Sequence, residues 1–229
     1  TIQAKREGVF EVDLQLRPYG SGGSMAVMLR AFENYFAPDG PAWDYERQAL
    51  LRLRPIAGDT ALGNQLVKLR DEYIHNVGAS FDVAAMRAMR ERQHRHLVTA
   101  GTFNAKFSAG GVVDVEYLVQ ALQINHGHRY EGVRHPNTLE AMRALRAAGV
   151  LSDGDFEQLY AAYRFLRLLI NALRMVRGNS RDLTVPHAES DEFAFLARRL
   201  SYRSNVAALA SDLTRHSQNV REGNTRLLV

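Results

Sequence analysis

The first patterned segment of the chain, residues 9–16, alternates between apolar and polar side chains. Phe10, Val12, Leu14 and Leu16 fall on one side of it, and this period of two is typical of a half-buried strand. No later segment alternates as clearly, and a single strand is not stable alone. We therefore expect its partners to come from residues outside this chain, from another subunit or from short strands that the pattern does not reveal. We also expect the chain to begin partway through a domain.

The rest of the chain is patterned for helices. Apolar residues recur three and four positions apart, and Gly, Pro and capping residues separate the periodic stretches. The expected helices cover 25–35, 42–54, 60–77, 83–100, 112–124, 138–148, 153–177, 190–200 and 204–221. A change in composition near 78–82 divides the chain into 1–79, which holds the strand, and 80–229. The fold class expected is mainly α, a helical bundle attached to the C-terminal remnant of an α/β domain.

Composition and charge narrow the classes of protein to which the chain can belong. The 229 residues are 46% hydrophobic and contain no cysteine, which excludes disulfides and thiolate metal sites. The 29 basic and 25 acidic residues are interspersed, and the net charge of +4 is too small to predict a nucleic-acid partner. No apolar run is long enough for a membrane span, and the N-terminus has no apolar signal segment. We therefore expect a cytoplasmic protein without a membrane partner.

The polar face of the predicted strand carries the first candidates for chemistry. Asp13, with Glu11 two residues earlier on the same face, suits a Mg²⁺ ligand because a strand with a buried back holds a carboxylate rigidly. Acidic residues are also ordinary on polar strand faces, and the strand alone favours that structural interpretation. The glycine-rich loop 20–23 could cradle a phosphate, but it lacks the lysine of a P-loop, which favours a plain turn.

Two later segments allow both a structural and a functional interpretation. Gly110 and Gly111 precede a predicted helix whose N-terminus could meet an anion, whereas Asp114 and Glu116 in its first turn fit an ordinary complement to the helix dipole. The fourth predicted helix carries a run of arginines, which we interpret as a solvated face rather than a nucleic-acid surface: Arg87, Arg90, Arg92 and Arg95.

Three ordered blocks of sequence carry a more specific signal. The first block is E-V-D-L-Q-L-R-P-Y-G at 11–20. The second consists of four short strings between 42 and 59: A-W, E-R-Q-A-L, R-L-R and G-D. The third is K-F-S-A-G-G-V-V-D-V-E-Y-L-V-Q at 106–120. In these blocks the chain resembles the glutamine synthetase adenylyltransferase family. The likeness covers about residues 8–120 and continues more loosely through 163–173.

The resemblance implies a fold and a chemistry. Enzymes of that family resemble DNA polymerase β in their nucleotidyltransferase core, with a Gly-Ser turn, an Asp-x-Asp pair on one strand and a third Asp on a neighbouring strand. Asp13 matches the third Asp, and with Glu11 it is the expected metal-binding group. Such carboxylates hold Mg²⁺ ions that align the α-phosphate of ATP. The remaining helices are expected to form the domain that the family shares with PII-uridylyltransferase.

The resemblance also implies nucleotide contacts. The candidates are Arg17, Gln48, Arg52 and Lys106. Gln48 and Arg52 are four residues apart and share a face if they lie on one helix. A buried polar network that fixes this helix beside the strand explains them equally well.

The function implied is transfer of AMP from ATP to a tyrosine of glutamine synthetase, the expected partner, or removal of that AMP by phosphorolysis. The chain departs from the family because no Gly-Ser turn with Asp-x-Asp precedes Asp13. Its only Asp-x-Asp, at 153–155, follows Ser152 at a predicted helix start, where acidic residues act as caps. We therefore expect the chain alone not to transfer AMP. The alternative is a non-catalytic regulatory module that responds to a PII-type protein or to glutamine.

A further departure lies late in the long helix at 153–177. Asn171 and Arg174 stand where the family commonly has histidine and glutamine. This difference indicates a divergent branch of the family rather than its best-known members.

Overall fold

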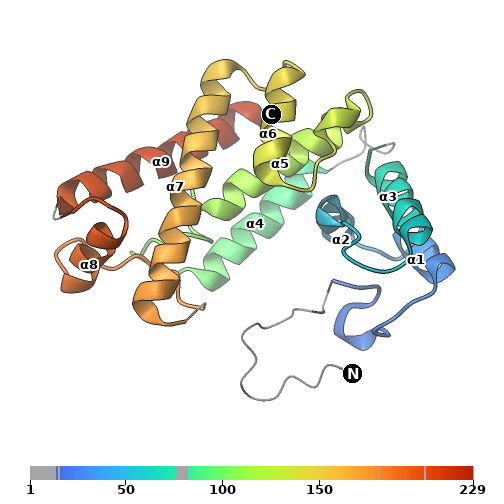
Figure 1. The fold of residues 1–229 in the computed structure, drawn as a ribbon, viewed down its shortest axis with the longest axis horizontal. Helices are drawn as coiled ribbons and strands as arrows, with labels where there is room; N and C mark the ends of the chain where they lie inside the picture. The colour runs from blue at the N-terminus through green and yellow to red at the C-terminus, as the bar shows by residue number, and fades with distance from the viewer. Residues whose placement is uncertain (1–13, 15, 76–81, 180, 204, 229) are drawn as a thin grey trace. The chain divides into compact units, whose positions relative to one another are not determined.

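The computed structural model describes residues 14, 16–75, 82–179, 181–203 and 205–228. The chain divides into two compact units, residues 1–77 and residues 78–229. Helices dominate both units (Figure 1). The only strand-like pairing among the described residues is an isolated antiparallel bridge between Asn104 and Thr184. The prediction of a mainly α fold is confirmed, whereas the α/β remnant stays a prediction.

The described part of the first unit contains α1 (Leu29–Phe36), α2 (Asp44–Ala49), a 3-10 turn at Leu50–Arg52, and α3 (Thr60–His75). Aromatic side chains of α1 form much of its core. The Phe32 and Phe36 ring centroids lie 4.7 Å apart. Helix α1 begins at Leu29 and not at the predicted residue 25. Met25 and Met28 are exposed, so burial does not stabilise an earlier turn.

The second unit contains α4 (Val83–Leu97), α5 (Val112–Gly127), α6 (Thr138–Ala147), α7 (Asp153–Arg177), α8 (Asp191–Arg199) and α9 (Val206–Leu227). Helix α7, at 25 residues the longest of these, packs against α5, α6, α8 and α9, and Figure 1 shows it crossing the bundle. Among the described residues, no helix has both the length and the apolar content that a membrane span requires.

The core of the second unit is built around the buried face of α7. Leu159, Leu166 and Leu173 of this helix are essentially inaccessible to solvent and pack in one cluster with Leu118 of α5 and Phe193 of α8. Their spacing of seven residues places them on one side of the helix. Replacing one such leucine by alanine typically costs about 2–5 kcal/mol, so this face holds the bundle together.

Local capping explains where most of these helices begin. The Ser152 hydroxyl accepts a hydrogen bond from the Asp155 amide at 3.1 Å, and Asp82 caps α4 in the same way through the Ala85 amide at 2.8 Å. Helix α9 differs from its prediction because it continues through Gly223 to Leu227. A Cβ at Gly223 would lie 3.2 Å from Cδ2 of Leu159, so this glycine permits close packing of α9 on α7.

Candidate functional site

The two residues predicted to hold Mg²⁺, Glu11 and Asp13, lie outside the described residues, as does most of the predicted strand. Of that strand, Leu14 and Leu16 are described, and their exposed fractions are 48% and 81%. Neither belongs to a strand, so the structure does not place these two side chains on a buried face. The described part of the chain contains no group of three or more His, Asp or Glu suited to a metal ion. The magnesium site stays a prediction.

Arg17 folds back over the glycine-rich loop that follows it. Its Nε donates to the Gly23 carbonyl at 3.1 Å, and a second guanidinium nitrogen donates to the Leu14 carbonyl. Within the loop, the amides of Gly20, Gly22 and Gly23 donate to nearby carbonyls. A phosphate cradle needs free amide groups, and the loop uses these three internally. The structure therefore supports the interpretation as a plain turn.

The block around Trp43 forms a polar network inside the first unit. Glu46 accepts the Trp43 amide at 2.9 Å and the Tyr35 hydroxyl at 3.0 Å, which caps α2 and joins it to α1. Burial, followed by the nearby Glu46 carboxylate, raises the pKa of Tyr35. Glu46 therefore fits the structural interpretation of this block.

Arg47 binds the chain between α1 and α2. Its Nη2 donates to the carbonyls of Ala37 at 2.7 Å and Gly40 at 3.1 Å. The backbone turns so tightly here that a Cβ at Gly40 would lie 2.5 Å from the Asn34 carbonyl oxygen. Sequence reasoning did not single out Arg47, although its place within the family block was the signal available.

Gln48 and Arg52, two of the predicted ATP contacts, do not lie on one α-helix. Gln48 is buried, with an exposed fraction of 5%, whereas Arg52 is exposed. The α-helix ends at Ala49 and tightens into the 3-10 turn, which changes the angle between successive side chains. The condition for the predicted common face, one helix that carries both residues, is therefore not met, and of the two only Arg52 is exposed.

The third family block forms the turn before α5 in the second unit. The amides of Lys106 and Phe107 both donate to the Asn104 side-chain oxygen at 3.0 Å. The amides of Val112 and Val113 donate to the carbonyls of Ala105 and Lys106. These are the first amides of α5, which an anion would need. Because the turn already occupies them, the structural interpretation of the helix start is favoured.

The two glycines of this block are required by close backbone approaches. Gly110 has φ of +81°, and a Cβ there would lie 2.2 Å from the Ser217 carbonyl oxygen of α9. At Gly111 a Cβ would lie 2.9 Å from the carbonyl oxygens of Lys106 and Ser108. The glycine pair thus fixes the turn against α9.

A largely buried ion pair between Arg90 and Asp114 joins the turn to α4. Arg90 Nε lies 2.5 Å from Asp114 Oδ1, and their side chains are 11% and 14% exposed. Arg90 also donates to the carbonyls of Phe107 at 2.8 Å and Ser108 at 3.0 Å, while Asp114 accepts the Gly110 amide at 2.7 Å. The interpretation of Arg90 as part of a solvated face is therefore wrong, whereas Arg87, Arg92 and Arg95 are exposed. The available signal was the four-residue spacing from the buried Met86.

A cavity of about 270 Å³ lies beside this ion pair. It is lined by Met86, Arg87, Arg90, Glu91, His94, Ala109, Asp114, Tyr117, Asn224 and Leu228. Arg90 Nη1 is buried and has no hydrogen-bond partner among the described residues. Most of the lining surface is apolar, and the lining residues include both acidic and basic side chains. Such a lining suits a small ligand better than a polymer.

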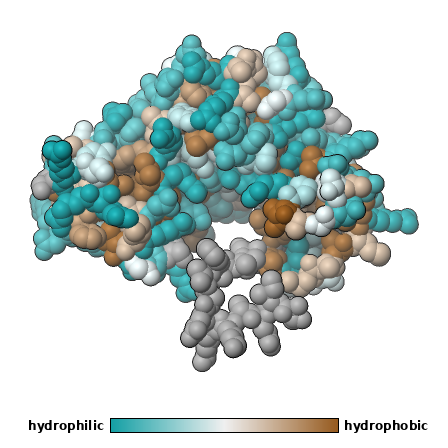
Figure 2. Space-filling model, viewed as in Figure 1, coloured by the Kyte–Doolittle hydropathy of each residue, from teal (hydrophilic) through white to brown (hydrophobic). Residues whose placement is uncertain are grey.

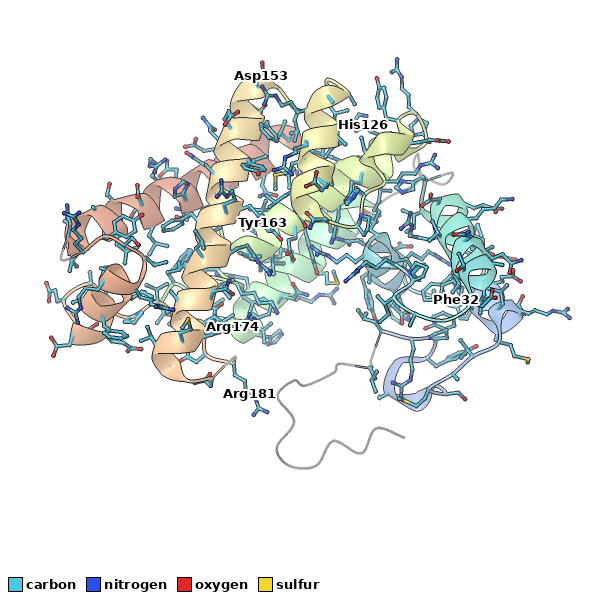
Figure 3. The ribbon with its side chains drawn as sticks, viewed as in Figure 1. Phe32, His126, Asp153, Tyr163, Arg174 and Arg181 are labelled. Carbon is cyan, nitrogen blue, oxygen red and sulfur yellow. The ribbon has the colours of Figure 1, made fainter. Side chains whose placement is uncertain are left out.

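Lys106, the predicted ATP contact of the second unit, is partly buried. Its Nζ lies 4.7 Å from the ring centroid of Phe107, a favourable arrangement of a cation over an aromatic face. Glu116 of the same block accepts the hydroxyl of Tyr163 at 3.0 Å. Tyr163 lies midway along α7 (Figure 3), so Glu116 joins α5 to α7.

The only Asp-x-Asp of the sequence forms the start of α7. Asp153 pairs with Arg146 at 2.7 Å, and Asp155 pairs with Arg226 of α9. The hydrogen bond from Ser152, followed by Arg226, holds the pKa of Asp155 below its usual value. Both carboxylates thus have arginine partners within the bundle.

Comparison with known proteins places family matches in both units. The model of the GlnD PII-uridylyltransferase family matches residues 83–228, and that of the glutamate-ammonia ligase adenylyltransferase family matches residues 2–69.

Curated relatives are similar over most of the chain. Bifunctional glutamine synthetase adenylyltransferase/adenylyl-removing enzymes are 36% identical over 91% of the chain in Bordetella pertussis, 31% over 80% in Pseudomonas putida and 32% over 96% in Streptomyces avermitilis. The chain spans 23%, 19% and 22% of these relatives, a fifth to a quarter of their length.

Proposed function

Because the chain belongs to the glutamine synthetase adenylyltransferase family, we propose that it forms part of an enzyme that acts on glutamine synthetase. The reaction proposed is transfer of AMP from ATP to a tyrosine of that protein, or removal of the AMP by phosphorolysis. Two family matches in succession along the chain, one in each unit, support the proposal.

The residues proposed for this chemistry are those that the family resemblance indicates. Glu11 and Asp13 would hold Mg²⁺, which would supply charge neutralisation and alignment of the α-phosphate of ATP. Arg52, exposed at the end of the 3-10 turn, attracts the phosphates of ATP. Lys106 of the second unit is a separate candidate for a phosphate contact. Gln48 is a positioning residue because its side chain is buried, and Arg17 orders the loop after Asp13 through its carbonyl contacts.

We further propose that the 229 residues do not transfer AMP by themselves. Transfer by this mechanism needs an Asp-x-Asp pair in addition to the acid that Asp13 matches. The observation that carries the proposal is the role of Asp153 and Asp155, which lie in the first turn of α7 after its N-cap Ser152 and pair with Arg146 and Arg226. These arginines compete with a metal ion for both carboxylates.

The test is incorporation of label from α-³²P-labelled ATP into purified glutamine synthetase in the presence of Mg²⁺. We expect no incorporation with the chain alone, and incorporation with the relative from Bordetella pertussis as the positive control. Transfer by the chain that is lost in the variant Asp13→Asn would overturn the proposal that these residues do not transfer AMP by themselves.

A second candidate function is regulation by the helical bundle, with a PII-type protein or glutamine as the signal. The self-contained core of the second unit favours it, because this core draws its buried side chains from α4 to α9 and the segments between them. Isothermal titration of the full chain with a PII-type protein, and separately with glutamine, tests this candidate. Heat of binding in either titration supports it, and its absence in both removes it.

A further inference from the structure

The outer surface of α7 is positively charged over the second half of the helix. Between residues 158 and 181 the chain carries five arginines and no Asp or Glu. Arg164, Arg167 and Arg174 are exposed and have no ion-pair partner in the described part of the chain. Positions 164, 167, 168, 174 and 175 fall within an arc of about 120° when each residue turns by 100°. They form one stripe about 16 Å long at a rise of 1.5 Å per residue.

Exposed apolar side chains lie along the same stripe. Leu168 and Met175 are 57% and 62% exposed, and Phe195 of α8 is 49% exposed. Arg199 of α8 donates to the Met175 sulfur at 3.0 Å, which makes the surfaces of α7 and α8 continuous at this point. We call the surface formed by Arg164, Arg167, Leu168, Arg174, Met175 and Phe195 the arginine face. Figure 2 shows brown, apolar surface among teal over the region of α8.

The composition of the arginine face is typical of a protein interface. Arginine, methionine and aromatic residues are enriched at the centres of interfaces, where apolar contact is surrounded by charge. Arg167 lies over the Tyr163 ring, with 6.0 Å from its Cζ to the ring centroid, and Arg198 lies 5.6 Å from the centroid of Phe195. These contacts hold guanidinium groups against aromatic rings without neutralising them.

We propose that the arginine face binds an acidic amphipathic helix of a partner protein. Leu168 and Met175 are seven residues apart, the spacing with which one helix packs along another. The unpaired arginines beside them select glutamate or aspartate on the flanks of the partner helix. A second copy of this chain does not fit, because it would bring arginines against arginines. This inference does not depend on the proposed AMP transfer.

The probe is a fluorescein-labelled synthetic helix with leucines at heptad spacing and glutamates on both flanks, titrated with the full chain and followed by anisotropy. The double variant Arg167→Glu/Arg174→Glu should weaken binding about tenfold, since each reversal converts an attractive pair into a repulsive one. The matched control is Arg92→Glu/Arg95→Glu on α4, which changes the same number of exposed arginines and should alter binding less than twofold. Circular dichroism checks that both variants keep their helix content.

Three further experiments distinguish this proposal from purely electrostatic binding and from binding to DNA or lipid. A peptide with the leucines replaced by serine should bind at least tenfold more weakly, because the proposal requires apolar contact. Hydrogen exchange should show protection by the parent peptide in the second half of α7 and in α8. Equal binding of the serine peptide, equal losses in the two arginine variants, or binding of duplex DNA or phosphatidylserine vesicles in place of the parent peptide would each overturn it.

Discussion

Replacing Arg90 by methionine removes one partner of the buried ion pair with Asp114. Removing one member of a buried pair costs about 3–5 kcal/mol because the other charge stays buried and uncompensated. Asp114 keeps its hydrogen bond from the Gly110 amide, and its side chain is 14% exposed. Both facts favour the lower end of this range, a loss of about 3 kcal/mol in the free energy of unfolding. For a unit of about 150 residues, that lowers the melting temperature by about 6–12 °C.

The assay is urea unfolding of the full chain, followed by far-ultraviolet circular dichroism and by tryptophan fluorescence. Trp43 is the only tryptophan and lies in the first unit, so its fluorescence is the reference signal and should move little. The control is Arg87→Met, an exposed arginine one turn earlier, which should change the free energy of unfolding by no more than about 0.5 kcal/mol.

A double-mutant cycle isolates the pair itself. Because Asp114→Asn keeps an acceptor for Gly110, Arg90→Met should cost at least about 1 kcal/mol less in its presence than alone. An Arg90→Met variant as stable as Arg87→Met, or costs that add without coupling, would refute the claim that this ion pair fixes the turn before α5.

Three other predictions test local features of the structure. Gly110→Ala should destabilise the bundle by several kcal/mol in thermal unfolding. The control Gly149→Ala, also at positive φ but with nothing within 4 Å of the added Cβ, should destabilise it by only about 1–2 kcal/mol. Equal losses of stability in the two variants would contradict the contact of Gly110 with α9. The pKa of Asp155 is lower in the folded state than in the unfolded state. The ionised Asp155 carboxylate therefore stabilises the fold above its unfolded pKa of about 3.9, and this stabilisation is lost as pH falls through the folded pKa. NMR titration should therefore show an Asp155 pKa that rises in Ser152→Ala, and an unchanged pKa would contradict the capping contact. Arg47→Met should lower the urea midpoint reported by Trp43 fluorescence, because four backbone carbonyls lose a charged donor. A midpoint equal to that of the parent would show that Arg47 does not hold α2.

Local signals in the sequence were enough to predict most of the helices. Ser152 and Asp82 cap α7 and α4 as expected, because an N-cap depends only on residues two or three positions away. The end of α9 was missed because Gly223 normally weakens a helix. Its contact with Leu159, a residue far away in the sequence, decides the outcome.

The side-chain environments were harder to predict than the helices. Arg90 looked like a surface residue because the arginines around it are exposed, and its partner Asp114 lies 24 residues away. Gln48 and Arg52 belong to different elements because the chain forms a 3-10 turn after α2, which the helical periodicity does not reveal. The sequence blocks indicate which segments carry the family likeness, whereas tertiary contacts determine which of their side chains are structural.

The most direct test of the account is a chimera in which this chain replaces the aligned segment of the Bordetella pertussis relative, with which it shares 36% identity over 222 residues. The measurement is the attachment of labelled AMP to glutamine synthetase and its removal. We predict that a folded chimera performs both reactions and that Asp13→Asn abolishes one of them. A folded chimera whose two reactions are both unaffected by Asp13→Asn would contradict the proposed role of this chain in adenylyl transfer.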